Sequence, residues 1–168
     1  MDDYFPQSSD LDADTIELSA DMRGILANAA DVQRFALAGN ATITLVSAKT
    51  GTRFTYKVRK PQNQEQPGPV RHFVSVLTGS DNENAYTYLG QMYNRPSGAM
   101  YSHGRKSRIG LDSTSAKAFD WFWRAIAKGR MPDNVQVWHE GRCGRCGRKL
   151  TVPQSIADGF GPECAGRL

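Results

Sequence analysis

All three cysteines of this 168-residue chain lie within its last 26 residues, as Cys143, Cys146 and Cys164. Two residues separate the first pair in "CGRCGRKL", and one turn at that spacing can direct both thiolates at the same metal ion. The third cysteine follows in "GFGPEC", where Pro162 suits the first turn of a short helix. An odd number of cysteines in a cytoplasmic protein favours a metal site over disulfides. Residues 138–168 are therefore predicted to form a small treble-clef-like unit around Zn²⁺, because so short a segment has almost no core of its own.

A closed tetrahedral zinc site needs a fourth ligand, and we predict that His139 supplies it. This histidine ends the strand-like segment "VQVWH", four residues before Cys143. The set His139, Cys143, Cys146 and Cys164 has the Cys3His composition of structural zinc sites. The sequence leaves other fourth ligands open, namely a water molecule or one of the side chains of His72, His103, Asp158 and Glu163.

The C-terminal segment also carries a longer pattern. Cys-x-x-Cys-Gly-Arg-x-Leu is followed by Pro-x-Ser-Ile and then by Gly-x-Gly-Pro-x-Cys, which are matched at Cys143, Cys146, Gly147, Arg148, Leu150, Pro153, Ser155, Ile156, Gly159, Gly161, Pro162 and Cys164. In this pattern the segment resembles the zinc-binding domain of an uncharacterised family that occurs mostly in phage and prophage proteins. The sheet-forming part of the chain is similar to uncharacterised phage proteins as well. The resemblance implies a zinc-bearing, phage-encoded protein, and it implies no particular activity.

The middle of the chain alternates apolar and polar residues, as the strands of an antiparallel sheet do. Residues 42–48 and 52–60 flank a short turn with a glycine, and residues 71–79 and 85–93 flank a second, polar turn. Within residues 52–60 the apolar side chains point to one face and the polar ones to the other: Phe54, Tyr56 and Val58 against Arg53, Thr55, Lys57 and Arg59. Residues 94–108 form a basic loop that has room for a further edge strand.

Two segments have the periodicity of amphipathic helices. The first begins at Ser19 and ends at Gly39, and Asn28 or Asp31 can divide it in two; its apolar positions are Met22, Ile25, Leu26, Ala29, Val32 and Phe35. The second spans residues 113–132, starting at Ser113 or Ser115 and ending at Gly129. Its apolar stripe, which is expected to cover the sheet, consists of Phe119, Phe122, Trp123 and Ile126, and Trp121 lies off this stripe.

These elements predict an α+β fold in three parts. Residues 1–18 form an acidic disordered tail, and residues 19–137 form a body in which helices pack on an antiparallel sheet of about four or five strands. Residues 138–168 form the zinc-binding unit.

Charge is distributed unevenly along the chain. Residues 1–40 carry eight acidic side chains against two arginines, whereas residues 41–168 carry 19 lysines and arginines against nine acids. A basic body favours a polyanionic partner. The acidic tail is expected either to keep the protein soluble or to compete with that partner for the basic surface.

These features predict a non-catalytic protein that binds host or phage nucleic acid with little sequence preference. The predicted phosphate contacts are Arg53, Lys57, Arg59, Arg95, Arg105, Lys106 and Arg108. The predicted stacking surfaces for unpaired bases are Tyr88, Tyr93, Tyr101 or Trp121. Cations around the cysteine pair either contact phosphate as well or offset the negative charge of three thiolates on one zinc ion: Arg142, Arg145, Arg148 and Lys149.

A second hypothesis is a phage inhibitor that contacts a host or defence protein directly, as an anti-CRISPR protein does. An enzyme is not expected, because no Ser-His-Asp spacing, phosphate-binding loop or paired-carboxylate motif is present. No apolar run approaches the roughly 18 residues that span a bilayer, and the acidic N-terminal segment does not resemble a secretory signal. We therefore expect a protein of the bacterial host cytoplasm that has no membrane partner.

Overall fold

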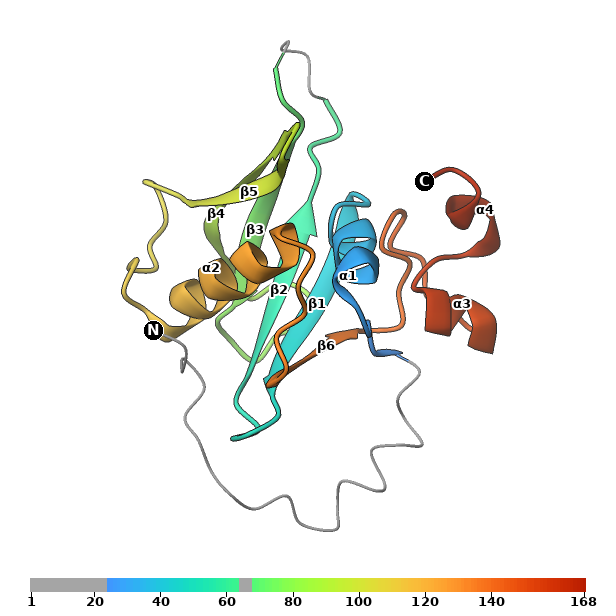
Figure 1. Cartoon of the computed structure of the whole chain (residues 1–168), viewed down its shortest axis with the longest axis horizontal. Helices are drawn as coiled ribbons and strands as arrows, with labels where there is room; N and C mark the ends of the chain where they lie inside the picture. The colour runs from blue at the N-terminus through green and yellow to red at the C-terminus, as the bar shows by residue number, and fades with distance from the viewer. Residues whose placement is uncertain (1–23, 64–67) are drawn as a thin grey trace.

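The computed structural model describes residues 24–63 and 68–168, so the predicted acidic tail lies outside the described residues. Its sheet has six strands in the order β5-β4-β3-β2-β1-β6, and every neighbouring pair is antiparallel (Figure 1). The elements are α1 (Ala29–Ala36), β1 (Asn40–Ser47), β2 (Arg53–Arg59), β3 (Arg71–Leu77), β4 (Tyr86–Arg95), β5 (Gly98–His103), α2 (Thr114–Ala127), β6 (Val135–His139), α3 (Pro153–Asp158) and α4 (Pro162–Ala165). The predicted α+β class is confirmed, and β5 and β6 bring the sheet to six strands.

Both longer helices lie on the same face of the sheet (Figure 1). Phe119 of α2 is fully buried, with its ring centroid 4.9 Å from those of Tyr56 on β2 and Tyr101 on β5. Trp123 donates a hydrogen bond from its indole nitrogen to the carbonyl of Ala99 at 2.9 Å, so its one polar atom is satisfied inside the core. The predicted apolar stripe of α2 therefore does cover the sheet.

The alternation predicted for β2 is confirmed. Tyr56 and Val58 are completely buried beneath the helices, whereas Arg53 at the start of the strand is exposed. In the described part of the chain, the opposite face of the sheet carries no helix. We call it the open face.

Helix α1 is shorter than the sequence periodicity predicts. The side-chain oxygen of Asn28 accepts a hydrogen bond from the backbone N–H of Asp31 at 2.9 Å, which caps the helix and starts it at Ala29. The preceding residues join the sheet instead: Ile25 forms an isolated bridge with Trp138, and Leu26 donates to the carbonyl of Val137. The predicted helix is thus wrong for residues 24–28, and its beginning at Ser19 lies outside the described residues. Among the described residues, no helix has the length and hydropathy to cross a membrane.

His72 on β3 is a buried polar residue within the core side of the sheet. Its Nε2 lies 3.0 Å from the carbonyl oxygen of Leu37, and its Nδ1 has no hydrogen-bond partner among the described residues. Burial lowers the pKa of His72 below its ordinary value; the hydrogen bond to Leu37 opposes this, and the charge of Lys60 adds to it. The folded protein therefore holds this ring in its neutral form.

We predict that His72 makes the fold less stable as the pH falls through the histidine range. The unfolded chain takes up the proton near the ordinary pKa of about 6.5, whereas the folded chain resists it to lower pH. His72→Leu should therefore flatten the decline in the free energy of unfolding between about pH 7.5 and about pH 5.5, measured by urea denaturation. An equally steep decline in the variant would contradict this assignment.

Candidate functional site

The three cysteines meet at one point, as predicted. The sulfur atoms of Cys143, Cys146 and Cys164 all lie within 4.8 Å of one another. Cys143 is buried, Cys164 is half-buried and Cys146 is exposed, so the group lies at the surface of the C-terminal unit. We call these three residues the cysteine group.

A short hairpin positions the first two cysteines. Arg142 and Lys149 form an isolated antiparallel bridge, and Cys143 donates its N–H to the carbonyl of Arg148 at 2.9 Å. The turn closes where Gly147 donates to the carbonyl of Cys143 at 2.8 Å, with a φ of 76° at Gly147 that disfavours other residues. The glycines of the Cys-x-x-Cys segment therefore serve the turn that brings the two sulfurs together.

A short helix positions the third cysteine. Pro162 opens α4, where its missing N–H costs nothing, and Cys164 follows within the first turn. Hairpin-borne and helix-borne sulfurs thus converge, which is the arrangement that the spacing predicts.

Backbone N–H groups prepare Cys143 for ionisation. Burial opposes the charged form, but hydrogen bonds from the backbone of Cys146, Gly161 and Arg145 outweigh it and lower the pKa of the Cys143 thiol to about 7. At Cys164, burial and the two neighbouring sulfurs raise the pKa, against the effect of the Arg145 side chain, whose Nη1 lies 4.0 Å from Sγ. The Cys143 sulfur therefore ionises readily, whereas a second thiolate beside it is disfavoured by charge repulsion. A cation between the sulfurs would remove that repulsion.

The geometry fits a metal ion with little adjustment. In a tetrahedral zinc–thiolate site with bonds of about 2.3 Å, two sulfurs lie about 3.8 Å apart. The observed separations of at most 4.8 Å are close to that value. The predicted metal-binding role of the three cysteines therefore has a geometric basis.

The structure does not bring His139 into the cysteine group. Its Nε2 donates to the carbonyl of Ile156 at 2.7 Å, and its Nδ1 accepts from the N–H of Gly141 at 3.0 Å. Burial lowers the pKa of His139, although the hydrogen bond to Ile156 and the charge of Glu140 oppose this, so the ring is neutral and has only one lone pair. Because Gly141 uses that lone pair, this arrangement of the ring offers no nitrogen to a metal.

The other predicted fourth ligands are also placed elsewhere. His72 bonds to Leu37, and His103 lies 3.0 Å from the carbonyl of Ile109 through its Nε2. Asp158 accepts a hydrogen bond from Gln154 within α3. Glu163 lies closer, since it lines the same hollow of about 360 Å³ as the three cysteines. No fourth donor among the described residues belongs to the group.

Phe35 joins the C-terminal unit to the body. Its ring centroid lies 5.2 Å from that of His139 and 5.7 Å from that of Phe160. A side chain at Gly144 or Gly159 would collide with this ring, because a Cβ at either position would lie within 2.8 Å of its atoms. The N–H of Asn40 at the start of β1 also donates to the carbonyl of Gly144 at 2.8 Å. The cysteine-bearing hairpin is thus continuous with the packing of the body.

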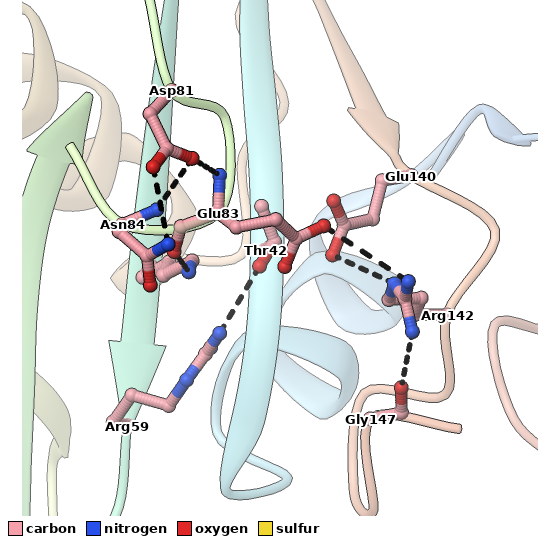
Figure 2. Close-up of polar contacts among 9 residues, drawn as sticks. Thr42, Arg59, Asp81, Glu83, Asn84, Glu140, Arg142 and Gly147 are labelled. Carbon is pink, nitrogen blue, oxygen red and sulfur yellow. Dashed lines mark hydrogen bonds and ion pairs between the residues drawn. The ribbon is translucent and has the colours of Figure 1, made fainter. Parts of the chain in front are cut away.

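The predicted phosphate contacts on β2 differ in their surroundings. Arg59 donates to the carbonyl of Ala41 and, at 3.3 Å, to the hydroxyl of Thr42, and burial lowers its pKa (Figure 2). Lys57 donates to the carbonyl of Glu83, and its Nζ lies 4.2 Å from the ring centroid of Tyr86. Of the three basic residues on this strand, only Arg53 is exposed, and the other two are half-buried.

An acidic turn lies over this half of the open face. Asp81 accepts hydrogen bonds from the backbone N–H groups of Glu83 and Asn84, which hold the turn between β3 and β4 in place (Figure 2). Glu83 and Glu140 then approach Arg142 to 4.0 Å and 3.8 Å. Two of the predicted phosphate contacts in the β1–β2 half of the open face, Lys57 and Arg59, are therefore already in use, and Arg142 has two acidic neighbours.

The β3–β5 half of the open face is different. The predicted cations of the following loop are all exposed: Arg95, Arg105, Lys106 and Arg108. Of these, Arg105 and Lys106 lie beside the rings of this face. Tyr88 and Tyr93 lie on this face, whereas Tyr101 packs on Phe119 in the core and Trp121 lies on α2. The structure adds two residues that the sequence analysis missed, Phe73 and Arg71, whose guanidinium lies 5.5 Å from the ring centroid of Tyr93. Phe73 had a signal, since it alternates in phase with Arg71 and Ser75 rather than with the apolar residues of β3.

Comparison with known proteins identifies the C-terminal segment only. Residues 138–168 match DUF6011, a family of unknown function. The resemblance to an uncharacterised family is thereby confirmed for this segment, and the phage origin stays a prediction. No curated protein and no solved structure matches the chain significantly.

We predict that purified protein holds one metal ion per chain and that the cysteine group, not His139, decides its retention. Cys164→Ser should lose the metal, as measured by elemental analysis, because it removes a thiolate. His139→Gln should keep the metal and lower the melting temperature, because the ring joins α3 to the hairpin without facing the sulfurs. Loss of metal from His139→Gln, at a temperature where the variant is folded, would make His139 the fourth ligand after all.

Proposed function

We propose that this protein binds nucleic acid through the β3–β5 half of its open face, and that Zn²⁺ in the cysteine group stabilises its C-terminal unit. The observation that carries the proposal is the combination of exposed cations with aromatic rings on a sheet face that no described helix covers. Arg71 and Lys106 are charged and exposed there, beside the rings of Phe73 and Tyr93. Cations supply affinity for phosphate that does not depend on sequence, and rings add stacking to unpaired bases.

The loop cations support this surface more strongly than the cations of β2 do. Lys57 and Arg59 donate hydrogen bonds within the protein, next to the acidic turn around Glu83. In the part of the chain that the structure describes, no ion pair involves Arg105 or Lys106. A phosphate group would therefore meet these two side chains without displacing an internal partner.

The cations beside the cysteine group have a different explanation. Arg145 contacts the sulfur of Cys164, and Arg148 and Lys149 line the hollow next to it. Three thiolates on a divalent ion leave a net negative charge, which nearby cations offset. We therefore assign these residues to the stability of the metal site and leave phosphate binding to the open face.

Zn²⁺ is the ion that the donor set favours. Thiolates are soft ligands that zinc binds in small structural units, and zinc brings no redox chemistry of its own. When bound, it would cross-link the hairpin to α4 through Cys143, Cys146 and Cys164. The pKa of Cys143 is lowered to about 7, which favours metal binding because a thiolate must form before the metal binds.

We predict that removal of charge at Arg105 and Lys106 weakens binding to random oligonucleotides and reduces its salt dependence. If both side chains contact phosphates of a single strand, Arg105→Gln with Lys106→Gln should flatten the slope of log affinity against log salt by about 1.4. Fluorescence anisotropy at several salt concentrations measures this slope.

Lys128→Gln with Arg130→Gln is the matched control for this experiment. It removes the same charge from the C-terminal end of α2, outside the open face. If the two double variants lowered affinity equally, the interaction would depend on net charge alone and not on the position of the cations. If affinity changed neither with salt nor with the Arg105 and Lys106 substitutions, nucleic-acid binding would be contradicted and a protein partner favoured.

A further inference from the structure

The β3–β5 half of the open face contains a hollow of about 520 Å³, a size typical of sites for small ligands. It is lined chiefly by three aromatic rings, one amide and two cations: Phe73, Tyr88, Tyr93, Gln91, Arg105 and Lys106. We call it the aromatic hollow.

Phe73 is exposed and the two tyrosines beside it are half-buried, so none of the three rings is enclosed by the core. Phe73 leaves 37% of its surface accessible, and its ring centroid lies 6.3 Å from that of Tyr88 at an interplanar angle of 61°. Single exposed apolar residues are ordinary on protein surfaces, but a cluster that lines a concavity marks a site of binding.

A β-bulge brings the two tyrosines to the same face. Tyr88 and Tyr93 are five positions apart, so strict alternation would place them on opposite faces of the sheet. The register between β3 and β4 shifts at Val74 and Ser75, so that Tyr88 lies opposite Ser75 and Tyr93 opposite Arg71. The hydroxyl of Tyr93 donates to the side-chain oxygen of Gln91 at 2.7 Å, which orients this amide at the hollow.

A fastened turn places the cations beside these rings. Ser107 donates its N–H to the carbonyl of Gly104 at 3.1 Å, which closes a turn with Arg105 and Lys106 at its corners. The same serine donates its hydroxyl to the carbonyl of Tyr88 at 2.7 Å. At Gly104 a Cβ would lie 2.5 Å from the ring of Tyr88, so this approach requires glycine. The two cations are therefore held at the aromatic hollow by bonds to β4.

A larger hollow of about 760 Å³ at the end of α2 also contains cations, but these have structural roles. Arg124 pairs with Asp120 at 3.0 Å, and Lys128 and Arg130 follow the C-terminal end of the helix. Cations at a helix C-terminus offset the negative end of its dipole. Arg105 and Lys106 follow a strand, where no such dipole accounts for them.

We propose that the aromatic hollow takes an unpaired base of a single-stranded nucleic acid. The base stacks on the ring of Phe73 with its edge toward the ring of Tyr88, and the adjoining phosphates contact Arg105 and Lys106. This inference rests on the proposed nucleic-acid binding and adds that the strand is unpaired. In a duplex each base is already stacked and paired, so it reaches such a surface only after it is flipped out at a cost in free energy.

The test compares single-stranded homopolymers with a duplex of the same length, using fluorescence anisotropy on the full, metal-loaded chain. Phe73→Ala should weaken single-strand binding about 5- to 150-fold, the loss expected for one stacked base, without changing the salt slope. Phe73→Leu should show most of that loss, since it keeps apolar bulk and removes the ring. Duplex binding should be weaker from the start and unchanged by either variant.

Leu111→Ala is the matched control, because it removes another exposed hydrophobic side chain, with 68% of its surface accessible, from the segment between β5 and α2, outside the aromatic hollow. Its single-strand affinity should equal that of the parent protein. The stacking inference would be overturned if single strand and duplex bound with equal, salt-dependent affinity and the Phe73 variants left that affinity unchanged. Nucleic-acid binding itself would then still stand. Failure to bind either polymer at low salt would overturn both.

Discussion

Within residues 24–63 and 68–168, helices cover only one face of the sheet, and the other features of the surface follow from this. The ring of Phe119 packs against Tyr56 and Tyr101 on the covered face. The open face must then be made compatible with water along all its strands. Over β1 and β2 this is done by internal pairing, with Arg59 on Thr42 and the turn at Glu83 above them (Figure 2). Over β3–β5 the surface instead carries aromatic rings beside exposed cations. This half of the open face is therefore the one available to a partner.

The C-terminal unit follows the edge strand β6 and is fastened to the body beside β1. Phe35 contacts His139 and Phe160, and Arg142 of the hairpin approaches Glu83. A cation in the cysteine group would thus hold together a segment with few buried apolar residues, and that segment supports the charged network over β1 and β2. In this account the metal is structural, and its loss affects the open face only through the hairpin.

Local patterns predicted much of this molecule, and the failures have physical causes. Alternation located the four strands of the two hairpins, and the Cys-x-x-Cys and Gly-Pro-x-Cys spacings located the cysteine group. The predicted helix is wrong over residues 24–28, because Asn28, one of its two predicted division points, caps α1 through the N–H of Asp31. The surroundings of His139 and Arg59 depend on long-range partners, and the shared face of Tyr88 and Tyr93 depends on a bulge, none of which periodicity reveals.

The most direct test of the account is where a single strand touches the protein. Titration with a short single-stranded oligonucleotide, followed by nuclear magnetic resonance of the aromatic side chains, reports this at each ring. The account predicts that the signals of Phe73 shift upfield under the ring current of a stacked base and that those of Tyr88 and Tyr93 change as well, while those of Tyr56 and Phe119 in the core stay in place. Shifts confined to the residues around the cysteine group, with the three open-face rings unaffected, would contradict it.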